Sequence, residues 1–218
     1  MDRLKDVLTT RGRAFAAAGT TLALCGWGLG FPDISRVGVL LLDPRADAHR
    51  GEGAASSFEW AVTAVASVVS HLSAFGYAIH LVSSETVHDG QAASTTEPEA
   101  ALDTLAVASL GASHQLEELV HAAHQVTASG GLVVAVVADR DEEALRHVAS
   151  LRQPGSRGLA LVLDTSSFGS AQGPRSSSRA ETFAELLHTA GWSATVVQAG
   201  TRVADVWSDL TARKAALR

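Results

Sequence analysis

The sequence predicts an α/β fold, with a mostly parallel sheet of about five strands, helices on both faces and an N-terminal apolar helix before the sheet. Two observations predict this class. Short apolar runs rich in valine and leucine alternate along the chain with longer segments of helical periodicity. Glycine- and serine-rich stretches separate many of these segments, as expected for turns. At 218 residues, the chain fits a single α/β domain with an appended segment.

The predicted strands are short, and their apolar character indicates burial. In chain order they are Val37–Leu42, Tyr77–Val82, Leu132–Val137, Leu159–Leu163 and Ala194–Gln198. The third is continuously apolar, which is typical of a strand covered on both faces. Parallel strands place their carboxyl ends at one edge of the sheet, where open α/β sheets bind their ligands.

Helices are predicted between and after the strands. They span Phe58–Phe75, Glu99–Leu110, Ser113–Thr127, Asp141–Leu151, Arg179–Ala190 and Val203–Ala215. Ser56 or Ser57 is expected to cap the first helix, which Gly76 ends, and Ser113 is expected to cap the third. Polar loops are predicted at 83–98 and 166–178.

The first 35 residues are predicted to be separate from an α/β domain at 36–218. Residues 14–31 form a run of 18 without a charge, close to the roughly 20 that span a bilayer as a helix. We therefore expect a single-pass protein of the cell membrane, with the side of the domain left open. The alternatives are a secretory signal, a lipoprotein signal ending at Cys25 and a buried amphipathic helix.

Composition and motifs exclude several function classes. The net charge of −6 and the lack of a basic face give no reason to expect a nucleic-acid partner. A single cysteine excludes an internal disulfide and a cysteine-based zinc site. Neither a phosphate-binding glycine loop nor a Gly-x-Ser-x-Gly motif follows the first strand, so we expect no enzyme of those classes.

Carboxylates follow three of the predicted strands. Asp43, Asp139 and Asp164 each come at or just after a strand end, so a parallel sheet would bring them to one edge. Oxygen ligands of this kind suit Mg²⁺. The alternative is that each aspartate caps the next helix or turn.

Three segments resemble a known family. They are Asp43-Pro-Arg-Ala-Asp-Ala-His49, Ser56-Ser-Phe-Glu-Trp-Ala-Val62 and His71-Leu-x-x-x-Gly-Tyr77. They are similar to the C-terminal part of actinobacterial proteins of domain-of-unknown-function family 58, which is a von Willebrand factor A-like domain. Residues 8–14 and 30–42 resemble the membrane-embedded start of that family. The family's second membrane helix and middle region are missing, which indicates an internal deletion joined within Val37–Leu42. At this point that run suits either the start of the second membrane helix or the first strand.

The resemblance implies a metal-adhesion loop that is degenerate in this chain. The family's site is an Asp-x-Ser-x-Ser loop with a threonine and an aspartate from later loops, whereas this chain has Asp43-x-Arg45-x-Asp47. Ser113 would stand in for the threonine and Asp139 for the distant aspartate. Arg45 introduces a cation where the ion would lie, so we expect a charge-assisted pair with Asp43 in place of a bound Mg²⁺.

The resemblance also implies a function. We expect a membrane-anchored, non-enzymatic protein-interaction module that assists assembly of a cell-envelope complex with a MoxR-type AAA+ ATPase or another membrane protein. One alternative is a divalent-metal-dependent adhesion or hydrolytic site at the carboxyl edge of the sheet. The other is a truncated paralogue without independent function.

Overall fold

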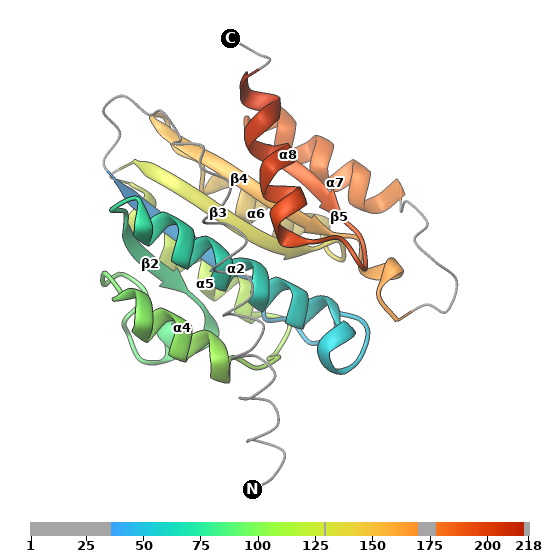
Figure 1. The fold of residues 1–218 in the computed structure, drawn as a ribbon, viewed down its shortest axis with the longest axis horizontal. Helices are drawn as coiled ribbons and strands as arrows, with labels where there is room; N and C mark the ends of the chain where they lie inside the picture. The colour runs from blue at the N-terminus through green and yellow to red at the C-terminus, as the bar shows by residue number, and fades with distance from the viewer. Residues whose placement is uncertain (1–35, 129, 170–177, 216–218) are drawn as a thin grey trace, which may run out of the picture.

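The computed structural model describes residues 36–128, 130–169 and 178–215 (Figure 1). The N-terminal helix predicted at 14–31 lies outside these residues. Among the helices that are described, none combines the length and the apolar character needed to cross a membrane.

Five parallel strands form one sheet in the order β2-β1-β3-β4-β5 (Figure 1). The strands are β1 Val37–Leu42, β2 Ala78–Val82, β3 Gly131–Ala138, β4 Ser156–Leu163 and β5 Ser193–Val197. All five predicted strands are present, and the pairings between them are parallel. The order is the 2-1-3-4-5 arrangement, one of the two common orders of doubly wound sheets.

Helices cover both faces of the sheet, as predicted. The α-helices are α2 Ser57–Ala74, α3 Ser84–His88, α4 Pro98–Val107, α5 Gln115–Thr127, α6 Glu142–Ser150, α7 Ser178–Thr189 and α8 Val203–Ala215, and two 3₁₀ turns are η1 Gly53–Ala55 and η2 Thr165–Ser167. Helices α2, α4 and α8 pack on one face, and α5, α6 and α7 on the other. The central strand β3 is buried along its whole length, which explains its continuous apolar sequence.

Capping residues set the ends of the longest helix. The Ser56 side chain accepts a hydrogen bond from the Glu59 amide at 3.1 Å, which fixes the start of α2. Gly76 ends the helical segment with a φ of +75°, a left-handed conformation that glycine adopts without a steric penalty. Both roles agree with the sequence prediction.

One short helix was predicted as a loop. Helix α3 has five residues, and a reciprocal capping box between Ser83 and Thr86 closes its first turn. A polar helix of this length has too few positions to show apolar periodicity. Its stability comes from local hydrogen bonds, which the pattern of apolar residues does not report.

The chain reverses its direction across the sheet between β1 and β3. From β1 it passes through α2 to β2 at one edge, and then returns past β1 to build β3, β4 and β5 on the other side. Ligand sites of doubly wound sheets lie outside the carboxyl ends of the two strands at this switch point. Asp43 and Asp139 directly follow those two strand ends.

Close packing of a tryptophan against a glycine joins β4 to the start of β5. A Cβ atom added to Gly158 would lie 2.3 Å from Trp192 Cδ2. The indole is 3% exposed, and its Nε1–H donates to the Ala149 carbonyl at 3.0 Å, so it cannot readily move away. A side chain at position 158 therefore has no space.

We expect Gly158→Ala to lower the free energy of unfolding by about 1–3 kcal/mol, because overpacking displaces a fixed ring. Gly38→Ala is the matched control in another strand of the same sheet. There the added Cβ would meet the flexible end of Leu72 at 3.1 Å, so we expect a smaller change. Urea unfolding of both variants measures the difference, and equal stabilities would contradict the packing argument.

Candidate functional site

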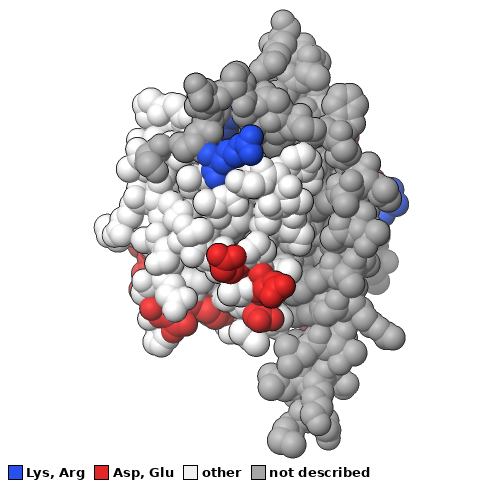
Figure 2. All heavy atoms as spheres, turned by 60° about the vertical axis from the view of Figure 1, so that its left-hand side comes forward, with Lys and Arg blue, Asp and Glu red and all other residues white. Residues whose placement is uncertain are grey.

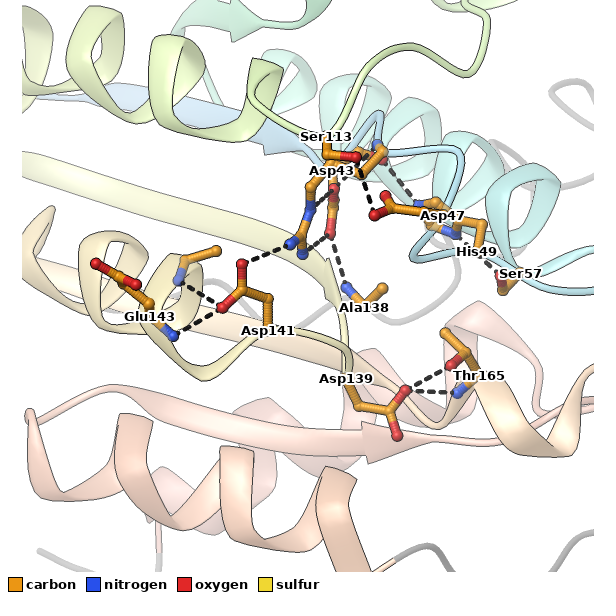
Figure 3. A network of polar contacts seen from close by, with 12 residues as sticks. Asp43, Asp47, His49, Ser57, Ser113, Ala138, Asp139, Asp141, Glu143 and Thr165 are labelled. Atoms are coloured by element: carbon orange, nitrogen blue, oxygen red, sulfur yellow. Dashed lines mark hydrogen bonds and ion pairs between the residues drawn. The ribbon is translucent and has the colours of Figure 1, made fainter.

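Asp43 and Arg45 form a buried ion pair at the carboxyl end of β1 (Figure 3). Their exposed fractions are 0% and 4%. The guanidinium donates from Nε to Asp43 Oδ1 at 2.9 Å and from Nη2 to Oδ2 at 2.8 Å, which is a bidentate contact. The charge-assisted pair that the sequence predicts is therefore present.

Two backbone amides complete the contacts of the Asp43 carboxylate. The Arg45 N–H donates to Oδ1 at 3.2 Å, and the Ala138 N–H donates to Oδ2 at 3.1 Å. Each oxygen thus accepts two hydrogen bonds, which uses the full acceptor capacity of an ionised carboxylate. Because Ala138 is the last residue of β3, Asp43 also fastens the two strands at the switch point.

A second carboxylate, at the start of α6, also faces the guanidinium, and we call the residues around Asp43 and Arg45 the switch-point site. Asp141 Oδ2 lies 3.6 Å from Arg45 Nη1. Burial would lower the pKa of Arg45, but the hydrogen bond and charge of Asp43, with the charges of Asp141 and Asp47, raise it above its ordinary value. Arg45 is thus a permanent cation held among carboxylates.

Asp141 also begins the following helix. Its Oδ1 accepts from the amides of Glu143 at 2.9 Å and Ala144 at 3.3 Å, which caps α6. The sequence marks Asp141 only as the start of a helix. Its contact with Arg45 depends on how β1 and β3 are placed, so no local pattern reports it.

His49 ties the loop after β1 to the start of α2. Its Nε2 lies 2.9 Å from the Asp43 carbonyl oxygen, and its Nδ1 lies 2.9 Å from Ser57 Oγ. A carbonyl can only accept, so Nε2 carries the proton, and the neutral ring offers Nδ1 as an acceptor to the Ser57 hydroxyl, whose other acceptor is the Arg50 carbonyl at 3.2 Å. Burial lowers the pKa of His49, and the nearby Arg45 charge lowers it further against the opposing effect of Asp43.

The Ser57–His49 contact has the distance of a nucleophile and its base, but not the access. Ser57 is 0% exposed and His49 is 5% exposed. The far side of the ring meets a backbone carbonyl, not a carboxylate that could stabilise an imidazolium. The pair is therefore a structural link, which sequence reasoning missed because the two residues lie in different elements.

Asp47 and Ser113 meet at the exposed rim of the switch-point site. Ser113 Oγ donates to Asp47 Oδ2 at 2.9 Å (Figure 3). The prediction that Ser113 caps α5 is wrong, because the helix begins at Gln115 after His114 and has no side-chain cap. The hydroxyl bonds the loop after β1 in place of the helix end. Four of the five predicted site residues therefore lie together.

Asp139, the fifth predicted residue, is directed elsewhere. Its Oδ1 accepts from Thr165 Oγ1 at 2.6 Å and from the Thr165 amide at 3.1 Å. Figure 3 shows this carboxylate pointing away from Asp43 and toward the turn after β4. Asp164, at the next strand end, accepts from Ser166 Oγ at 2.6 Å. Both aspartates therefore organise turns, as the alternative interpretation of strand-end carboxylates expects.

The residues of the switch-point site do not fit a divalent cation. Within the described ranges, no three histidine, cysteine, aspartate or glutamate side chains are placed to share a metal ion. To bind Mg²⁺, Asp43 would have to release a buried guanidinium, which leaves a desolvated charge unpaired. The positive charge of this site is supplied by Arg45.

We expect Asp43→Ala to lower the free energy of unfolding by about 3–5 kcal/mol, because it leaves the Arg45 charge buried with its main partner removed. The double variant Asp43→Asn/Arg45→Met is expected to lose less than the sum of its single variants. Asp205→Ala breaks the exposed Arg202–Asp205 pair and serves as the control, with little change expected. Additive effects in urea unfolding would contradict direct coupling of the buried pair.

Stability is expected to fall as the pH drops below about 6.5, the pKa of histidine in an unfolded chain. Burial lowers the pKa values of His49, His71 and His80 in the fold. Between the folded and unfolded values the unfolded chain binds more protons, so stability rises with pH and is fully present above that window.

The test is urea unfolding at several pH values between about 5.5 and 7.5, in the window set by the unfolded pKa. His49→Gln keeps one donor and one acceptor, and we expect it to reduce the dependence on pH. His88→Gln, at an exposed position, is the matched surface control and is expected to keep the wild-type slope. A wild-type slope in His49→Gln would show that this ring does not contribute.

What the switch-point site can bind follows from the contacts of its own residues. Comparison with protein-family models, with curated proteins and with solved structures found no match.

Proposed function

We propose that this chain is a membrane-anchored, non-enzymatic protein-interaction module, in which a degenerate metal-adhesion loop has become a fixed part of the fold. The observation that supports it best is the Asp43 carboxylate, whose acceptor positions are filled by Arg45 and the Ala138 amide. A site of this kind has exchanged an ion and its waters for a guanidinium of its own chain.

The geometry around this pair favours a binding surface over a reaction centre. The ion pair is buried, so it offers a substrate neither an accessible nucleophile nor a free base. At the rim of the site, Asp47 and Ser113 are exposed, and the hydrogen bond between them orders this surface. Fixed polar groups at a rim lower the conformational cost of binding a second protein.

The membrane anchor and the partner class rest on the sequence resemblance. Residues 14–31 are the proposed anchor. By analogy with the resembled family, the proposed role is to assist assembly of a cell-envelope complex with a MoxR-type AAA+ ATPase or another membrane protein. The von Willebrand A-like character of the domain belongs to the same proposal.

Calorimetric titration with Mg²⁺, Mn²⁺ and Ca²⁺ tests whether the switch-point site binds a divalent cation. We expect no saturable heat with the wild-type chain, because Asp43 is engaged by Arg45. Arg45→Ser would free the carboxylate and restore a hydroxyl at the third position of the loop, so weak saturable binding is expected. Asp43→Ala/Arg45→Ser is the matched control that lacks the carboxylate, and circular dichroism checks that each variant folds.

A different result would favour the alternative of a metal-dependent adhesion or hydrolytic site. That result is saturable binding by the wild-type chain that disappears in Asp43→Ala. The interaction itself is tested by affinity purification of the full chain from its own solubilised membranes, where we expect an AAA+ ATPase to co-purify. The absence of any specific partner would favour a truncated paralogue without independent function.

A further inference from the structure

Fixed positive charge is missing from one half of the domain. Residues 51–139 contain no lysine or arginine, so all 17 basic residues of the chain lie outside this span. The same span holds ten acidic residues, namely Glu52, Glu59, Glu85, Asp89, Glu97, Glu99, Asp103, Glu117, Glu118 and Asp139. It builds α2, β2, α3, α4, α5 and β3.

The surface reflects this asymmetry. Figure 2 looks at the side of the molecule that carries β2 and α4. Among the described residues on this side, acidic side chains gather over its lower part, and basic side chains are seen only toward its upper end and one edge. A negative field of this kind attracts basic partners and repels acidic ones.

An exposed apolar pair lies within the span that lacks basic residues. Val107 is 59% exposed and Leu110 is 44% exposed, and we call these two residues the apolar lip. In the described ranges only one other large hydrophobic side chain is exposed to a similar extent, Phe75, which directly follows α2. Val107 ends α4 and Leu110 lies in the connection between α4 and α5, which also forms part of the rim of the switch-point site through Ser113.

Hydrogen bonds hold this connection on both sides. The Ser109 N–H donates to Glu85 Oε1 of α3 at 3.2 Å. The Gly111 N–H donates to the Pro44 carbonyl at 2.7 Å, and the Ala46 N–H donates to the Gly111 carbonyl at 3.0 Å. The lip is therefore presented in a fixed position without being buried, which reduces the entropy lost when a partner covers it.

The elements next to the lip in the chain, and α3, which bonds the connection, carry acidic side chains. Asp103 lies one helical turn before Val107 on α4 and is exposed. Glu117 and Glu118 occupy the exposed first turn of α5. Glu85 contacts the connection itself. A ligand that covers the apolar lip and extends along α4 or the start of α5 would thus meet carboxylates, so its own flanking residues should be basic.

We infer that the apolar lip is the docking site for an amphipathic segment of the protein partner, with apolar residues that contact Val107 and Leu110 and basic residues that face the surrounding carboxylates. This inference rests on the proposed function, because it names the surface and the partner chemistry of the same interaction module. A second copy of this chain is a poorer occupant, because a two-fold contact would bring identical acidic rims together.

The test uses the full chain in detergent and a labelled amphipathic helical peptide of leucine and lysine, followed by fluorescence anisotropy. We expect Val107→Ser/Leu110→Ser to weaken binding about tenfold, because it removes the apolar anchors. Phe75→Ser is the matched control, because it removes another exposed hydrophobic residue, at the end of α2 that is opposite to the switch-point site. It is expected to leave the affinity unchanged.

Charge is tested with the same readout. Asp103→Asn/Glu117→Gln/Glu118→Gln is expected to weaken binding several-fold and to reduce its dependence on salt. A peptide in which glutamate replaces lysine is expected not to bind. Equal loss of affinity in Phe75→Ser, or no loss in Val107→Ser/Leu110→Ser, would overturn the inference, because binding would then be a general property of an acidic surface.

Two further outcomes would assign the lip to another occupant. Light scattering that finds a dimer, converted to a monomer by Val107→Ser/Leu110→Ser, would identify a second copy. A photo-crosslinker at position 110 that reacts within the same chain with residues 1–35 would identify the N-terminal segment. If a partner still co-purifies with the Val107→Ser/Leu110→Ser variant, the lip is not its docking site. That result would overturn this inference and leave the proposed function standing.

Discussion

Asp43 lies where the chain reverses its direction across the sheet, and the neighbouring segments contact its carboxylate and its carbonyl. It accepts from Arg45 within its own loop and from Ala138 at the end of β3. Its carbonyl meets His49, which in turn meets Ser57 at the start of α2. A single buried charge thus fixes one strand end against its neighbour and against the helix that follows.

The same contacts explain why the switch-point site differs from a typical ligand site. Sites at the switch point of doubly wound sheets usually keep backbone amides and carboxylates free for a ligand. Here the amide of Ala138 is used by Asp43, and Asp43 is used by Arg45. Binding capacity at this edge is left to the rim, where Asp47 and Ser113 are exposed. A ligand at this edge would therefore contact the exposed side chains of the rim.

The sequence predicted the strands because burial on both faces leaves continuous apolar runs, and most helices because their apolar residues recur with helical periodicity. It also predicted the Asp43–Arg45 pair, since only one residue, Pro44, separates these oppositely charged groups in the sequence. It did not predict the direction of Asp139, which depends on the turn after β4. Nor did it identify Asp141 as a partner of Arg45, because that contact joins residues 96 positions apart through the sheet topology.

The bond from the Ala138 amide to Asp43 has a consequence for the order in which the fold can form. It joins residues 95 positions apart, and loops of that length close late relative to local helices and turns. Asp43 and Arg45 can meet early while still hydrated, but they lose their water only when β3 docks beside β1. Desolvation of the ion pair and completion of the central sheet are therefore one step, so a chain with an incomplete β3 retains a hydrated, open loop after β1.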